Sequence, residues 1–222
     1  MQLFHRSWQR AWQGAGCTMP GDVLAAELLA RYREPQRRYH TVQHLRECLA
    51  HLEQVLGQVP DPVAVELAMW FHDAVYALAG PGAASSEQRS AASNELRSAQ
   101  WAHQALLAGG APPALARQVH ELIMATRHDA LPATPDQCWL VDIDLSILGA
   151  VPARFDEYER QVRDEYAFVP EELFRRKRAE VLAGFVARAR IYSTPFFHDR
   201  LEAPARVNLG RSIAALGVGA DT

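Results

Sequence analysis

The amino-acid sequence predicts an all-α fold of about nine or ten helices, packed as one bundle-like domain over residues 1–222. Apolar residues recur at helical spacing through most of the chain, and no segment alternates polar and apolar residues as a half-buried strand would. Hydrophobic residues make up 49% of the 222 residues, which is enough to bury a substantial core. The expected helices cover residues 3–12, 22–33, 41–55, 61–77, 87–108, 112–126, 135–148, 152–168, 170–192 and 196–216.

Proline and glycine mark the ends of the first three helices. The Gly14-Ala15-Gly16 break follows the first helix, so residues 1–20 are expected to form a helical extension to a core of about residues 21–192. Pro35 ends the second helix, and Gly57 ends the third.

Capping residues mark the next helices. Asp61 is the expected N-cap of the helix that Pro62 opens. Ser85 or Ser86, at the end of a small-residue loop, is expected to cap the long helix that follows. Thr134, directly before a proline, is a further start signal.

Proline also opens the C-terminal helices at Pro152 and Pro170. The last helix lies within residues 193–222 and contains Pro204. Because proline removes a helical hydrogen bond, Pro204 is expected to kink this helix or to split it in two.

Composition excludes several classes of protein. The formal charge of −3 gives no overall attraction to nucleic acid or to anionic membranes. No apolar run reaches the roughly 18 residues of a membrane span, and no hydrophobic signal segment follows the N-terminus, so a cytoplasmic protein is expected. The three widely spaced cysteines, Cys17, Cys48 and Cys138, fit reduced and packed thiols better than disulfides.

One of three His-Asp dipeptides, His72-Asp73, lies inside an apolar run. On a helix, the His72 ring would share a face with Val65, Met69 and Tyr76. A polar ring on such a face needs a partner, which is a metal ion or, in the structural alternative, a neighbouring backbone carbonyl.

Two further segments offer matching ligands. His40 and His44 are one helical turn apart and could hold one metal, or place one ligand beside a proton donor; the alternative is a pair of solvated histidines. Asp144 would emerge from an apolar stripe, where a carboxylate needs a cation or strong donors. Asp142 is expected to be less deeply embedded in apolar side chains and is the second candidate for a metal ligand here. The structural alternative for this segment is an ordinary salt bridge to an arginine.

The ordered combination of these segments resembles the HD superfamily of metal-dependent phosphohydrolases, and most closely its small bacterial branch of predicted hydrolases. The resemblance is carried by residues 39–45, 71–76, 94–95 with 98–99, 142–149, 162–166 and 205–209.

The resemblance implies a metal centre. It makes His44, His72, Asp73 and Asp144 the metal ligands, Asp144 being the second acid of an Asp-x-Asp-Leu segment. Such a mixed nitrogen and oxygen set suits Mn²⁺, Fe²⁺, Ni²⁺ or Zn²⁺, with Mg²⁺ as a further candidate. The resemblance does not imply a second metal ion. His128 is the one residue that could serve as a ligand of such a second ion.

The resemblance also suggests a mechanism in which a metal-activated water attacks phosphorus. Asp73 would orient the water, and His40, at the position of a proton-donating histidine in related phosphodiesterases, would protonate the leaving alkoxide. Glu95 could steer a His or an Arg beside the ligands. The arginines proposed to contact the phosphoryl group are Arg38, Arg163, Arg178 and Arg206, although an Arg-rich helix such as that around Arg178 is often only a solvated face.

The expected function is hydrolysis of a small phosphate ester, nucleotides being one candidate class, without a nucleic acid or membrane partner. The alternative is a catalytically silent HD domain that serves as a nucleotide sensor or docks a partner. A di-iron carboxylate bundle is excluded, because no glutamate is followed by a histidine three residues later.

Overall fold

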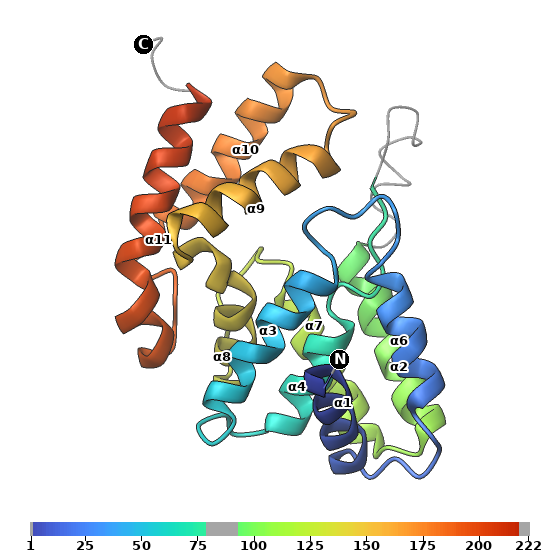
Figure 1. The fold of residues 1–222 in the computed structure, drawn as a ribbon. Helices are drawn as coiled ribbons and strands as arrows, with labels where there is room; N and C mark the ends of the chain where they lie inside the picture. The colour runs from blue at the N-terminus through green and yellow to red at the C-terminus, as the bar shows by residue number, and fades with distance from the viewer. Residues whose placement is uncertain (1, 79–92, 218–222) are drawn as a thin grey trace.

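The computed structural model describes residues 2–78 and 93–217, and every regular element in these ranges is helical (Figure 1). The all-α prediction is confirmed. The elements are α1 (Gln2–Gly14), α2 (Asp22–Arg31), α3 (Val42–Val55), α4 (Pro62–Phe71), α6 (Asn94–Gly109), α7 (Pro113–Ala125), α8 (Pro135–Asp144), the 3-10 helix η1 (Leu145–Gly149), α9 (Pro152–Glu165), α10 (Glu171–Val186) and α11 (Pro195–Leu216).

Several helices begin where their capping residues predict. The Asp61 side chain accepts a hydrogen bond from Ala64 N, and Pro62 is the first residue of α4. Thr134 and Gln137 form a reciprocal capping box at the start of α8. In α6 the cap is Ser93, which accepts from Leu96 N, while the expected cap at Ser85 or Ser86 and the loop over residues 79–86 lie outside the described residues.

Helices α4 and α10 end well before their expected residues, because an arginine side chain binds the carbonyls that follow each of them. Helix α4 stops at Phe71 instead of continuing to Ala77, and the Arg37 guanidinium donates to the carbonyls of Asp73 and Ala74. Helix α10 stops at Val186 instead of Tyr192, and Arg206 donates to the carbonyls of Val186, Arg188 and Ala189. These long-range bonds replace the hydrogen bonds that a further helical turn would make.

The C-terminal helix is more continuous than expected. Helix α11 continues through Pro204 as one element, so the expected split does not occur. Phe197 before the proline and Ala205 and Leu209 after it are buried, and Asn208 donates to the carbonyls of Leu148 and Ala150 in and after η1. These contacts hold α11 against η1 along its length.

Helix α4 is the centre of the core. All of its residues from Ala64 to Phe71 are buried, and it contacts α1, α3, α6, α7 and α8. Helices α9, α10 and α11 form a second group, which contacts η1 and lies to one side of the first group in Figure 1. The segments that carry His44, His72 and Asp144 all belong to the first group.

The N-terminal helix, expected as an extension, contributes to this core. Trp8 of α1 stacks on Trp12 and meets Trp70 of α4 edge to face, with ring centroids 5.1 Å apart in both pairs. Glu66 of α4 is buried and pairs with Arg10. Removing residues 1–20 would therefore expose one side of α4.

Cys17, Cys48 and Cys138 are all free thiols. Among residues 2–78 and 93–217, no helix has both the length and the apolar character that a membrane crossing needs.

Candidate metal centre

The four side chains that the resemblance makes candidate metal ligands come together in the structure. His44 lies in the first turn of α3, His72 and Asp73 directly follow α4, and Asp144 is the last residue of α8. His44 Nε2 lies 3.1 Å from His72 Nε2 and 3.1 Å from Asp144 Oδ1. Asp73 Oδ2 lies 3.0 Å from His72 Nε2 and 3.5 Å from His44 Nε2.

These separations match those of atoms that share a metal ion. Nitrogen and oxygen ligands lie about 2.1 Å from ions such as Zn²⁺, so neighbouring ligand atoms are about 3.0 Å apart at right angles and about 3.4 Å apart at tetrahedral angles. His44, His72 and Asp144 each offer one ligand atom within 4.8 Å of the others. Asp73 Oδ2 lies within the same range of both histidine nitrogens.

The orientation of the His72 ring is fixed from its other side. Its Nδ1 donates to the Met69 carbonyl at 2.8 Å, so in the neutral ring Nε2 carries a lone pair. The Met69 carbonyl is thus the backbone partner that would satisfy His72 without a metal, but it satisfies only one of the two ring nitrogens. The other nitrogen faces His44 and Asp73, and a bound cation would satisfy all three groups at once.

Charges in the centre favour a cation. Burial opposes ionisation of Asp73 and of Asp144, yet the neighbouring histidines outweigh it and lower the pKa of both carboxyls. Burial also opposes protonation of His72, and the two carboxylates outweigh it and raise the pKa of His72. The centre thus presents two carboxylates and two imidazoles to one point, and His44, His72 and Asp144 among them could hold a metal ion.

His128 binds the outer oxygen of Asp144. Its Nε2 lies 3.0 Å from Asp144 Oδ2, while Oδ1 faces His44. The residue follows α7 with a left-handed φ of 57°, which turns its side chain out of the helical path. The sequence left open whether His128 contacts the site; the structure places it there, as a support for Asp144.

Glu165, at the end of α9, is the acidic residue that positions His40. One of its oxygens accepts hydrogen bonds from the backbone N–H groups of Arg38, Tyr39 and His40, and the other lies 2.8 Å from His40 Nδ1. Burial raises the pKa of the Glu165 carboxyl, but these donors outweigh it and lower the pKa to about 2. Burial also lowers the pKa of His40, and Asp73 and Glu165 outweigh it and raise that pKa.

The sequence analysis missed Glu165, although a signal was present. The buried face of α9 carries Phe155, Tyr158, Val162 and Glu165 at helical spacing. An acid on an apolar stripe is the same signal that identified Asp144. The role was given to Glu95 instead, which makes no hydrogen bond or ion pair with a His or Arg side chain within the described part of the chain.

Arg37 connects the loop before α3 to the turn after α4, and nothing in the local sequence distinguishes it from Arg38. Its side chain is buried and donates to the carbonyls of His40, Asp73 and Ala74. It also lies over the rings of Tyr32 and Tyr76, at 5.2 and 5.4 Å. Arg37 therefore fixes His40 and Asp73 relative to each other.

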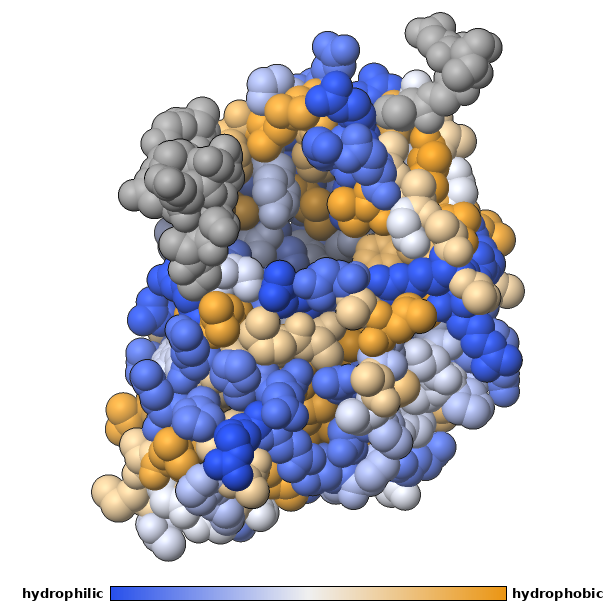
Figure 2. Space-filling view, turned by 180° about the vertical axis from the view of Figure 1, so that it is seen from behind, coloured by the Kyte–Doolittle hydropathy of each residue, from blue (hydrophilic) through white to orange (hydrophobic). Residues whose placement is uncertain are grey.

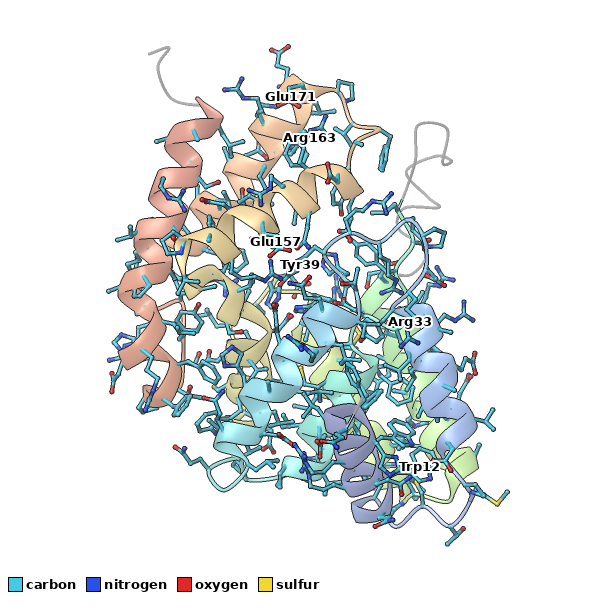
Figure 3. The ribbon with its side chains drawn as sticks, in the orientation of Figure 1. Trp12, Arg33, Tyr39, Glu157, Arg163 and Glu171 are labelled. Carbon is cyan, nitrogen blue, oxygen red and sulfur yellow. The ribbon has the colours of Figure 1, made fainter. Side chains whose placement is uncertain are left out.

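The four arginines expected to contact a phosphoryl group are not gathered at the centre. Arg163 donates to Glu171 and to the carbonyls of Tyr166 and Val169, and Figure 3 shows Arg163 and Glu171 together, away from Tyr39. Arg206 caps α10 as described above. Arg178 pairs with Glu159 over the ring of Tyr158. The remaining arginine, Arg38, is exposed on the loop next to His40.

Asp142 has a structural role. It is fully buried, whereas the Asp144 side chain is 13% exposed, so the expected order of burial is reversed. Its oxygens accept from Ser193 N, Thr194 N and the Thr194 hydroxyl, directly before α11. Burial is the main reason that the pKa of Asp142 is raised. These bonds hold the start of α11 against α8.

Two pockets are lined by residues that neighbour the centre, His40 in one and His128 in the other. One of about 570 Å³ is lined by His40 and by residues of α9 and α10, and the space-filling view shows a hollow with hydrophobic walls on the face opposite to that of Figure 1 (Figure 2). Another of about 500 Å³ is lined by His128, Arg188 and Arg190 among others. Arg188 also donates to the His128 carbonyl, and sequence analysis missed both arginines.

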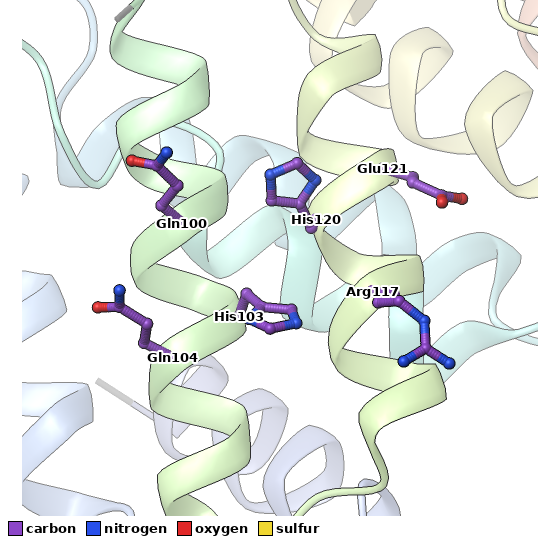
Figure 4. A pocket seen from close by; sticks show the side chains of 6 residues that line it. All are labelled: Gln100, His103, Gln104, Arg117, His120 and Glu121. Atoms are coloured by element: carbon purple, nitrogen blue, oxygen red, sulfur yellow. The ribbon is translucent and has the colours of Figure 1, made fainter.

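A further pocket of about 380 Å³ lies between α6 and α7 (Figure 4). Its six lining residues include His103 and His120, whose ring centroids are 6.4 Å apart. None of the six belongs to the four-residue centre, and no carboxylate joins the two histidines at ligand distance.

Comparisons with protein-family models, with curated proteins and with solved structures find no match for this chain. The fold and the site define an all-α protein with a buried histidine and aspartate group that could hold a metal ion.

Proposed function

We propose that this protein is a metal-dependent phosphohydrolase of the HD type, which cleaves a small phosphate ester with water. The observation that carries the proposal is the convergence of His44, His72, Asp73 and Asp144 from three separate segments onto one point. The resemblance to the HD superfamily predicts that these four side chains converge.

The ligand set fits a divalent transition ion. Two imidazoles and two carboxylates suit Mn²⁺, Fe²⁺, Ni²⁺ or Zn²⁺, with Mg²⁺ as a further candidate. When bound, such an ion lowers the pKa of water from about 15.7 towards 7 and polarises a phosphoryl oxygen. Asp73, whose side chain is partly exposed, is the ligand proposed also to orient the attacking water.

His40 is the proposed proton donor to the leaving alcohol. Its Nδ1 is held by Glu165 at 2.8 Å, so Nε2 is the ring nitrogen available to a substrate. The raised pKa of His40 keeps a larger fraction of the imidazole protonated near neutral pH, which a general acid requires. The ring also stacks on Tyr76 and lines the 570 Å³ pocket, where a leaving group could lie.

A metal and substrate screen tests the proposal. Metal-stripped protein is reloaded with each ion in turn and assayed for phosphate release from nucleoside, alkyl and aryl phosphates. The matched pair of variants is His72→Ala and His198→Ala, because His198 also belongs to a His-Asp dipeptide but lies outside the centre and beside an exposed Asp199.

We expect metal-dependent hydrolysis that His72→Ala abolishes and His198→Ala retains. Equal metal content in the wild type and His72→Ala would refute the metal centre. Stoichiometric metal without hydrolysis of any ester would instead support the silent sensor or docking domain.

A further inference from the structure

We propose that the pocket beside His40 binds the alcohol portion of the substrate, and that the preferred substrate is a phosphate ester of a bulky apolar alcohol. This inference rests on the proposed phosphohydrolase function and names its substrate class.

The pocket has the size and the walls of a site for an apolar group. Its volume of about 570 Å³ lies within the range of roughly 300–1,000 Å³ typical of small-molecule sites. Helices α9 and α10 and the connection between them supply its apolar lining, which consists of Val162, Val169, Leu173, Phe174 and Val181. Leu173 and Val181 are 40% and 51% exposed, so apolar surface is left uncovered here.

The pocket is continuous with the proposed proton donor. His40 is part of its lining, together with the neighbouring Tyr39. The Tyr39 ring lies 4.8 Å from the ring of the metal-ligand candidate His44, measured between centroids. An ester whose phosphoryl group reached the metal centre would therefore place its alcohol oxygen near His40 and its organic group in the pocket.

The polar groups of the lining do not suit a nucleotide. A nucleobase presents donors and acceptors on its edges, which proteins commonly read with amides, carboxylates or backbone groups. The lining contains no Asn, Gln, Asp or Glu side chain. Of its two cationic side chains, Arg178 is held by Glu159 in a largely buried pair, and Lys177 lies at the exposed surface beside Glu180.

The Tyr39 hydroxyl is a buried polar group of the pocket lining that lacks a hydrogen-bond partner. Tyr39 is 4% exposed, and its hydroxyl makes no hydrogen bond in the structure. A buried hydroxyl without a partner costs free energy, and a ligand oxygen would remove that cost. A tyrosine hydroxyl can donate one hydrogen bond. We infer that it donates to an oxygen of the bound ester.

Substrate preference is tested with two esters of primary alcohols, 2-(1-naphthyl)ethyl phosphate and adenosine 5′-monophosphate. Because both leaving groups are alkoxides of primary alcohols, a difference in kcat/KM reflects recognition of the organic group more than the acidity of the leaving alcohol. We expect kcat/KM to be at least about tenfold higher for the naphthyl ester, from burial of its apolar surface. Equal or higher kcat/KM for the nucleotide would overturn the proposal.

Binding is tested separately from turnover, by calorimetry with 2-(1-naphthyl)ethylphosphonate, which is not hydrolysed, in metal-loaded and metal-free protein. Val181→Glu places a charge in the pocket, and Val207→Glu makes the same change at an exposed position of α11 outside it. We expect Val181→Glu to weaken binding at least about tenfold and Val207→Glu to leave it unchanged. Equal affinities in the two variants would overturn the assignment.

The role of the hydroxyl is tested with Tyr39→Phe. This change should weaken phosphonate binding about tenfold while leaving the denaturation midpoint unchanged or raised, because no hydrogen bond is lost in the free protein. A lowered midpoint with unchanged affinity would show a structural hydroxyl and refute this part. If no ester is hydrolysed with any metal, the proposed function fails, and the calorimetric results still decide whether the pocket binds an apolar phosphonate.

Discussion

The Nε2 atoms of His44 and His72 lie 3.1 Å apart, although the two residues belong to different helical segments. His72 Nδ1 already donates to a backbone carbonyl, so in a neutral ring the nitrogen that faces His44 has no proton to give. Two carboxylate oxygens lie beside the same pair. A cation shared by all four groups is the arrangement that leaves none of them without a partner.

The first prediction separates His44 from His40. His44→Ala should lose both bound metal and activity, because one of four ligands is removed. His40→Ala should keep full metal occupancy and slow hydrolysis about 10²- to 10⁴-fold for alkyl esters, and much less for nitrophenyl phosphate, whose leaving group needs no proton. Metal analysis and kinetics with both esters measure the contrast. Loss of metal in His40→Ala, or equal slowing of both esters, would contradict the assigned roles.

The second prediction concerns His128, which contacts the oxygen of Asp144 that faces away from His44. Because it orients a ligand, His128→Ala should weaken metal affinity about 10- to 100-fold and still bind one equivalent at saturating metal. Asp144→Ala should not bind stoichiometrically at the same concentration. Competition with a chromophoric chelator measures both affinities. Identical affinities of wild type and His128→Ala would show that the contact does not support the centre.

The third prediction uses Glu165, whose carboxylate raises the pKa of His40. If protonated His40 is the general acid, kcat falls as the pH rises through the pKa of His40. Glu165→Gln removes the stabilising charge and lowers that pKa, so the alkaline fall in kcat should begin at lower pH. Profiles of kcat against pH for wild type and variant test this, and unchanged profiles would exclude His40 as the titrating group.

The same variant should change the acid stability of the fold. The pKa of Glu165 is about 2 in the folded protein and ordinarily 4.5, so its contribution is present above about pH 4.5 and lost as the pH falls towards 2. Glu165→Gln should be less stable than wild type by about 2 kcal/mol at pH 7, and the difference should shrink by pH 2 to 3. Denaturant unfolding at several pH values measures it. A difference that does not depend on pH would point to packing alone.

The last prediction concerns Arg37. Its buried guanidinium binds three carbonyls, so Arg37→Leu should leave those acceptors unpaired and destabilise the protein by about 3–5 kcal/mol. The neighbouring Arg38 side chain is exposed, and Arg38→Ala should change stability by less than about 0.5 kcal/mol. Denaturant midpoints compare the two variants. Similar midpoints would mean that water or other donors satisfy the carbonyls.

The sequence by itself indicated where several helices begin, and together with its resemblance to a known family it indicated which residues form the candidate centre. Asp61, Thr134 and the adjacent prolines act through bonds within a few residues, and these local signals were confirmed. His72 and Asp144 were recognised because a polar group on an apolar helical face needs a partner, and the structure brings them to within 3.6 Å of each other.

Tertiary structure alone decided where two helices end and which polar residues surround the centre. Helix α4 stops where Arg37 binds the following carbonyls, and α10 stops where Arg206 does so. The choice of Glu165 over Glu95 likewise depends on packing between α9 and the loop before α3. The physical reason is that these contacts join residues up to 127 positions apart, so neither helical periodicity nor local capping carries information about them.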